Sequence, residues 1–196
     1  MKRLLFLVAA LLLGAGPALA ATATWQIDPN HATIEFKVRH MMVAYVKGTF
    51  AKVDGTIEAD DADPAKAKIR VTIDTASIDT NIAKRDEHLR SPDFFDVARF
   101  PTMTFVSKAV AVDGNGKGKV VGDLTIRDVT REVTLEVAEV TPAIKDPWGK
   151  TRRGASATTT INRKDFGLTW NTLLETGGVA VGDEVKISLD FEMIRK

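Results

Sequence analysis

Hydrophobic and polar residues alternate along most of this chain, and a period of two is typical of strands that bury one face. Within residues 34–40, one face would carry Ile34, Phe36, Val38 and His40. The other face of that segment would carry only charged residues. The same alternation recurs along the chain and predicts strands at residues 34–40, 46–57, 67–74, 102–112, 119–126, 132–140, 155–162 and 184–194.

Short polar or glycine-rich segments separate these strands at residues 60–64, 113–116, 127–130 and 176–178. Such turns favour antiparallel neighbours. About eight strands, each apolar on one side, fit a single sheet closed on itself better than two stacked domains. The predicted fold class is therefore all-β with short helices, in the form of a closed antiparallel barrel.

One segment, residues 80–90, breaks the alternation and predicts a short helix. Asp86 would share the helical face of Ile82 and Leu89, so we expect it to point toward the barrel and to pair with Arg163. With Arg85 and His88 on the same helix, this charged set is interpreted as structural, seating the helix on the barrel.

After the helix, Ser91 and Pro92 have the residue types of an N-cap and a first helical position, which predicts a second helical turn. That turn would present Phe94 and Phe95. These two rings would either close one end of an internal cavity or plug a solid core.

The N-terminus has the features of a cleaved secretory leader. Lys2 and Arg3 precede an apolar run too short for a bilayer span, and the segment ends in small residues at Ala18 and Ala20. We therefore expect residues 1–20 to be removed, one domain to cover residues 21–196, and the mature protein to be exported to a periplasm without a membrane helix.

Charge and cysteine content narrow the function further. The 27 basic and 26 acidic side chains are mixed along the chain, with no basic patch or acidic tail, so no nucleic-acid partner is indicated. The chain has no cysteine, so stability must come from burial rather than disulfides. The pattern does not separate a monomer from a dimer.

The inward faces of the strands combine bulky and small residues, and small residues opposite aromatics fit either a packed core or a channel. If a channel exists, its apolar wall would suit a hydrocarbon chain. The residues expected to bind such a ligand are Phe36, Val38, His40, Phe50, Ile69, Val71, Phe94, Phe95, Phe105, Leu124, Ile126 and Phe191.

The sequence resembles the YceI-like polyisoprenoid-binding family over nearly all of the mature chain. The resemblance rests on residues 31–40 (HATIEFKVRH), 48–50 (GTF), 77–80 (SIDT), 85–91 (RDEHLRS), 93–96 (DFFD), 100–105 (FPTMTF), 122–126 (GDLTI) and 161–167 (INRKDFG). It implies a lipocalin-like barrel that holds an isoprenoid or similar amphiphile, with a quinone or phosphate head, and it does not imply catalysis. No cofactor is predicted apart from such a bound lipid or quinone. Asp128 departs from the glycine expected in the turn after residues 122–126, although Asp tolerates left-handed backbone better than most residues.

A metal site and a catalytic site are the alternatives to a lipid-binding role. His31 and His40 lie too far apart in an extended strand to share a metal, and no compact zinc-ligand spacing occurs, so no metal site is predicted. Ser156 lacks the final glycine of a nucleophile elbow, and no catalytic residue is assigned. Two other functions remain open: a small lipid-modifying hydrolase or isomerase using His40, Asp86 or His88, and a ligand-free structural or stress-related protein with a filled core.

Overall fold

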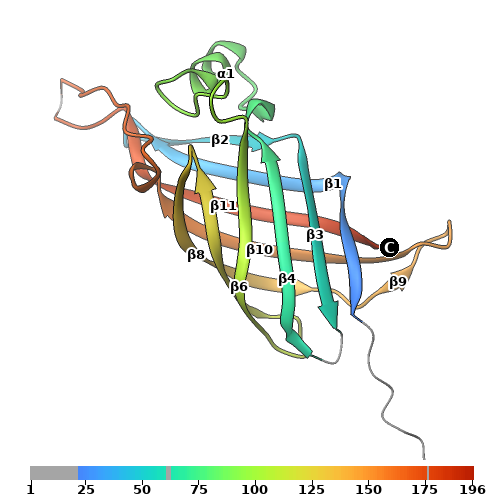
Figure 1. Ribbon diagram of the computed structural model, residues 1–196. Helices are drawn as coiled ribbons and strands as arrows, with labels where there is room; N and C mark the ends of the chain where they lie inside the picture. Colours follow the sequence, from blue (N-terminus) through green and yellow to red (C-terminus); the bar gives the residue numbers. More distant parts are fainter. Residues whose placement is uncertain (1–21, 61–62, 176) are drawn as a thin grey trace, which may run out of the picture.

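The alternating segments form one antiparallel sheet that curls into a barrel (Figure 1). The structure is a computed structural model and describes residues 22–60, 63–175 and 177–196. Its strands are β1 (Ala23–His40), β2 (Ala44–Phe50), β3 (Val53–Asp60), β4 (Asp63–Asp74), β5 (Ile78–Asp79), β6 (Thr102–Val112), β7 (Gly118–Ile126), β8 (Val129–Val140), β9 (Ile144–Lys145), β10 (Thr151–Asn162) and β11 (Val181–Arg195). The helical elements are η1 (Thr75–Ser77), α1 (Ala83–Arg90) and η2 (Arg163–Phe166).

Closure depends on β1, which pairs with β11 on one side and with β2 and β3 on the other. The ring runs β1, β3, β4, β6, β7, β8, β10, β11 and returns to β1, with every pairing antiparallel. The closed eight-stranded antiparallel barrel predicted from the sequence is confirmed. A closed ring leaves no unpaired edge along these strands.

The single strand predicted at residues 46–57 is wrong, because the chain forms β2 and β3 with a break at Ala51 and Lys52. At the break, the Ala51 amide donates to the Ser77 carbonyl (3.1 Å) and the Lys52 amide donates to Ser77 Oγ (3.1 Å). β2 then pairs with β5, whereas β3 pairs with β4. The buried positions change from even-numbered residues in β2 to odd-numbered residues in β3, so the phase of the alternation shifts at the break.

β1 begins eleven residues before the predicted start, at Ala23, and its register against β11 shifts between Ile27 and Ala32. Such a bulge re-aims side chains locally. It contains Asp28 and His31, which matter below.

Helix α1 lies over one end of the barrel (Figure 1), close to the predicted position. The second helical turn predicted after Ser91 is wrong, because this segment forms turns in which the Phe94 and Asp96 amides both donate to the Ser91 carbonyl. Asp128 adopts a φ of 60°, so the left-handed backbone expected of the turn is retained. Among the described residues, no helix is long and apolar enough to cross a bilayer.

Candidate functional site

The barrel interior holds a cavity of about 450 Å³, a size typical of small-molecule sites. Of the two interiors that the sequence allowed, the hollow one is found. Eight of the predicted ligand-binding residues lie on its wall: Phe36, Phe50, Ile69, Val71, Phe105, Leu124, Ile126 and Phe191. Aliphatic and aromatic side chains from all eight barrel strands complete most of the lining.

Glycines beneath aromatic rings help to keep this interior open. A Cβ atom built on Gly48 would lie 2.5 Å from Phe36 Cζ, and one built on Gly122 would lie 2.5 Å from Phe105 Cζ. Real Cβ atoms do not approach so closely, so each ring lies directly over a position without a side chain. The rings therefore line the wall, which leaves space at the centre.

The cavity reaches the end of the barrel opposite α1, where its lining becomes polar. This polar rim includes Asp60, Asp113, Thr141 and Arg153 from the connections and strand ends at that end. The Arg153 guanidinium carbon lies 4.3 Å from the centre of the fully buried Trp25 ring, which also lines the cavity. A cation over an indole face is an attractive arrangement that fixes both side chains.

Four predicted ligand-binding residues do not line the cavity. Val38 is half-buried near the end of β1. His40 was expected to face the interior, and this is wrong: it is exposed at the end of β1, where the chain enters the turn at residues 41–43. Phe95 packs edge-on against Phe50 (ring centres 5.7 Å apart), so it lies behind the cavity wall at the α1 end.

The fourth, Phe94, belongs to an aromatic cluster outside the cavity. Its ring centre lies 5.1 Å from that of His88 and 5.2 Å from that of Trp170. His88 Nε2 also lies 3.0 Å from Asp93 Oδ2. This cluster holds α1 against the segment that follows η2, so His88 has structural contacts.

Asp86 is buried as predicted, but its pairing with Arg163 is wrong. Asp86 Oδ1 accepts hydrogen bonds from the Thr80 amide (2.8 Å) and the Thr80 hydroxyl (2.5 Å). Arg85 donates from Nε to Thr80 Oγ1 (2.7 Å) and from its guanidinium to the Thr80 carbonyl (2.8 Å). The carboxylate thus seats the helix on its own preceding segment, a local contact that satisfies buried polar groups.

Arg163 instead organises the chain between β10 and β11. Its buried guanidinium donates to the carbonyl oxygens of Gly182 (2.9 Å), Trp170 (2.9 Å), Val181 (3.3 Å) and Leu168. Asp183 Oδ1 lies 3.4 Å away. Burial lowers the pKa of Arg163 from its ordinary value.

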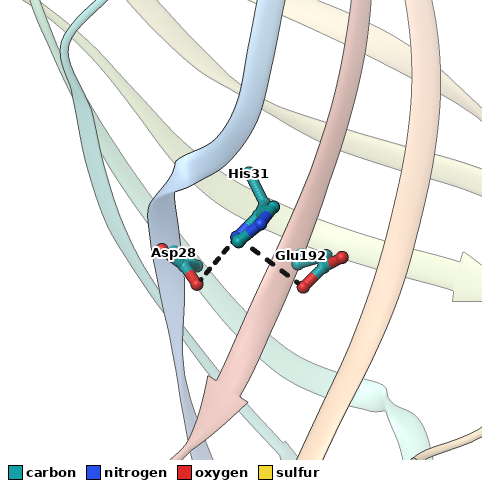
Figure 2. Close-up of side chains that lie close together, drawn as sticks. All are labelled: Asp28, His31 and Glu192. Atoms are coloured by element: carbon teal, nitrogen blue, oxygen red, sulfur yellow. Dashed lines mark hydrogen bonds and ion pairs between the residues drawn. The ribbon is translucent and has the colours of Figure 1, made fainter. Parts of the chain in front are cut away.

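A second polar cluster joins the β1 bulge to β11 (Figure 2). His31 Nδ1 lies 3.1 Å from Asp28 Oδ2 and 3.9 Å from Glu192 Oε2. One ligand atom from each of these residues falls within 4.8 Å of the others, a grouping that could hold a metal ion. However, Arg152 already places a guanidinium nitrogen 2.7 Å from Asp28 Oδ2 and 3.1 Å from Glu192 Oε2, which supplies the positive charge there.

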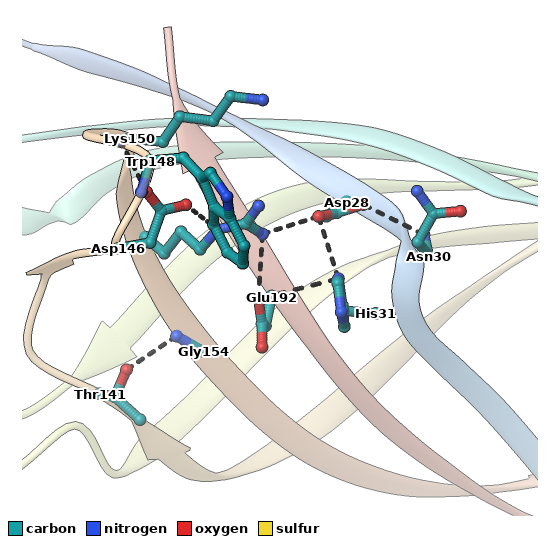
Figure 3. Close-up of polar contacts among 10 residues, drawn as sticks. Asp28, Asn30, His31, Thr141, Asp146, Trp148, Lys150, Gly154 and Glu192 are labelled. Atoms are coloured by element: carbon teal, nitrogen blue, oxygen red, sulfur yellow. Dashed lines mark hydrogen bonds and ion pairs between the residues drawn. The ribbon is translucent and has the colours of Figure 1, made fainter.

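Arg152 connects this cluster to the connection between β9 and β10 (Figure 3). Its Nε donates to Asp146 Oδ2 (2.7 Å). The hydrogen bond from Arg152 lowers the pKa of Asp146, and Arg152 together with His31 and the Asn30 amide lowers that of Asp28 to about 2. Both carboxylates, in turn, raise the pKa of Arg152.

We expect Asp28→Asn to reduce the dependence of stability on acid. The folded pKa of Asp28 lies near 2 and the ordinary value is 3.8, so its contribution is present above pH 3.8 and is lost as pH falls toward 2. In urea unfolding over this range, the wild type should lose about 1–2 kcal/mol more than the variant. Equal losses in the two proteins would contradict this assignment.

Sequence reasoning missed Trp25, Arg152 and Arg153 because their partners lie far away along the chain. Asp28 and Arg152, for example, are 124 positions apart. A local signal did exist for the β9–β10 connection. Residues 146–149 read Asp-Pro-Trp-Gly, which is a turn sequence.

Comparison with known proteins gives the same picture. The model of the YceI-like domain matches residues 25–193. Protein YceI of Escherichia coli O157:H7 is 43% identical over 160 residues, covering 82% of this chain and 83% of that protein. The crystal structure of Burkholderia cenocepacia BcnA has a TM-score of 0.73 at 26% identity, covering 85% of this chain and 98% of that one.

A more distant structural neighbour shares the fold alone. It is a polyisoprenoid binding domain from Saccharophagus degradans implicated in plant cell wall breakdown, with a TM-score of 0.63 at 14% identity, covering 90% of this chain and 100% of that one. The family match extends over nearly the whole barrel, from Trp25 in β1 to Met193 in β11. The chain described here belongs to the YceI-like family.

Proposed function

We propose that this protein binds a long-chain isoprenoid lipid, of polyprenyl or quinone type, inside the barrel and carries it without catalysing a reaction. The observation that carries the proposal is the apolar cavity of about 450 Å³. Each methylene buried in such a site contributes about 0.8 kcal/mol. Several isoprene units would therefore offset the cost of ordering a flexible chain.

The charged side chains of the cavity lining, Asp60, Asp113 and Arg153, all lie at one end, which suggests how the ligand lies. The tail would point toward Phe36 and Phe50 at the α1 end, where the wall is aromatic. The head group would lie at the polar rim, near Thr141 and Arg153. A single polar end suits an amphiphile with one head group.

Two observations besides the cavity support the proposal: the comparison with known structures and the leader expected at residues 1–20. The Saccharophagus degradans domain of similar fold is described as binding polyisoprenoids. The leader expected from the sequence of residues 1–20 would bring the protein to the periplasm, an aqueous space in which an isoprenoid needs a carrier.

The positions of the polar residues favour binding over catalysis. An enzyme acting on the head group was expected to use His40, Asp86 or His88, and none of these three lines the cavity. Asp86 and His88 are instead engaged by Thr80 and Asp93.

The test is to identify what the purified protein carries. Organic extraction followed by mass spectrometry should release a long-chain isoprenoid. Protein stripped of lipid should also take up an isoprenoid quinone and retain it through gel filtration. An empty protein that takes up no quinone would overturn the proposal.

A further inference from the structure

A short hairpin, formed by β9 and the start of β10, projects from the barrel (Figure 1). The cavity lining includes Val140, Thr141 and Pro142, and the chain then runs directly into β9. Residues 144–150 form the hairpin and lead back into β10. We call these seven residues the rim hairpin.

The tip of the rim hairpin is held in a fixed shape around Asp146. Asp146 Oδ1 accepts hydrogen bonds from the amides of Trp148 (3.0 Å) and Lys150 (2.8 Å), and Gly149 supplies a φ of 84°. Asp146 Oδ2 accepts from Arg152, which is itself bound to Asp28 and Glu192 on the barrel wall (Figure 3). The tip is therefore built rigidly onto the barrel.

This rigid tip presents large apolar side chains to the solvent. Trp148 is 81% exposed and Ile144 is 64% exposed. Exposing such side chains forgoes their burial energy, and exposed apolar groups beside a polar rim are typical of interaction surfaces. Since backbone atoms, not the indole ring, make the hydrogen bonds of the turn, the Trp148 side chain is not needed to form it.

The charge of the tip favours one kind of partner. The rim hairpin carries Lys145 and Lys150, both exposed, and its single carboxylate is turned inward to Arg152. The solvent-facing charge is therefore positive beside exposed aromatic and aliphatic groups. Tryptophan favours the head-group layer of a membrane, and lysines near a membrane surface are attracted to anionic lipids.

We propose that the rim hairpin docks this protein onto an anionic phospholipid bilayer, with Trp148 and Ile144 entering the head-group layer. Docking in this orientation brings the polar rim, and with it the cavity, to the membrane surface. A lipid could then pass between bilayer and cavity with little exposure to water. That purpose rests on the proposed function, whereas the docking itself does not.

Vesicle flotation tests the docking directly. Wild-type protein should float with vesicles of phosphatidylglycerol and phosphatidylcholine, and Trp148→Ala should weaken binding about tenfold. Lys145→Gln and Lys150→Gln should each weaken binding to these anionic vesicles about fivefold at low salt, and neither should affect the weaker binding to phosphatidylcholine alone.

The matched control is Leu173→Ala. Leu173 is also 81% exposed, but it lies before the start of β11. The rim hairpin lies beside the other end of β11, because the start of β10 pairs with the end of β11. This variant should bind vesicles like the wild type. The wild type and all variants have the same residues before Thr22, so any contribution of those residues to vesicle binding is the same in every protein. The proposal would be overturned if Trp148→Ala bound vesicles as well as the wild type does, or if Leu173→Ala lost binding instead.

The alternative to a membrane is a second copy of this protein bound to the rim hairpin, and sedimentation velocity separates the two. If sedimentation velocity shows a dimer that Trp148→Ala dissociates while vesicle binding is unchanged, the hairpin is a contact between two copies and the proposal is wrong. The lipid content of each protein is measured separately by mass spectrometry. A protein that is empty and takes up no quinone, but still binds vesicles, would refute the proposed function and leave the docking intact.

Discussion

Replacing Ala157 with phenylalanine should reduce isoprenoid uptake about 100-fold while the barrel stays folded. Ala157 is buried on β10 and lines the cavity. A phenylalanine ring there would displace about three to four methylenes of ligand, each contributing about 0.8 kcal/mol, which together correspond to about two orders of magnitude in affinity. The measurement is a titration of delipidated protein with an isoprenoid quinone.

Thr158→Phe is the matched control for this experiment. Thr158 is the next residue on the same strand, and its side chain is exposed and does not line the cavity. This variant should bind the quinone like the wild type. If Ala157→Phe also bound normally while remaining folded, the ligand would not occupy the barrel interior.

Replacing Arg163 with methionine should lower the free energy of unfolding by about 3–5 kcal/mol, because the buried carbonyl oxygens that accept from its guanidinium lose a charged donor. Arg163 donates to four backbone carbonyls between Leu168 and Gly182. Methionine retains much of the volume and none of the donors. Urea unfolding of the two proteins at neutral pH measures the difference.

Two further variants separate this effect from a loss of charge. Arg163→Lys should recover little stability, because an ammonium cannot reproduce the planar fork of a guanidinium. Arg131→Met should cost less than about 0.5 kcal/mol, since Arg131 is exposed and donates only to the adjacent Thr130 carbonyl. A stable Arg163→Met protein would show that water or other donors replace the guanidinium.

Periodicity predicted the barrel well because each strand buries one face, and that requirement is local. The predicted strand at residues 102–112 coincides with β6, and the predicted strand at 119–126 begins one residue after β7 does. The same local reasoning failed at Ala51, where the chain changes partner and the buried positions change from even-numbered to odd-numbered residues. Pairing between distant strands, rather than residue type, decides where β2 ends.

The predictions for the candidate site were also correct where the reason is local and wrong where it is not. Of the predicted apolar residues within strands, all except Val38 lie on the cavity wall, because alternation fixes the face on which they lie. The prediction for His40 failed because alternation does not show where a strand ends, and His40 is the exposed last residue of β1. The partner predicted for Asp86 was wrong, because Asp86 accepts hydrogen bonds from Thr80, six positions away, whereas Arg163 donates to carbonyl oxygens after η2.

The two glycines beneath aromatic rings have a consequence for which molecules can enter. A methyl group at Gly48 would push the Phe36 ring off the wall and into the bore, and one at Gly122 would do the same to Phe105. Isoprenoids carry a methyl branch on every unit and are thicker than straight acyl chains. On the proposed function, two hydrogen atoms in place of methyl groups therefore leave room in the bore for the methyl branches of an isoprenoid.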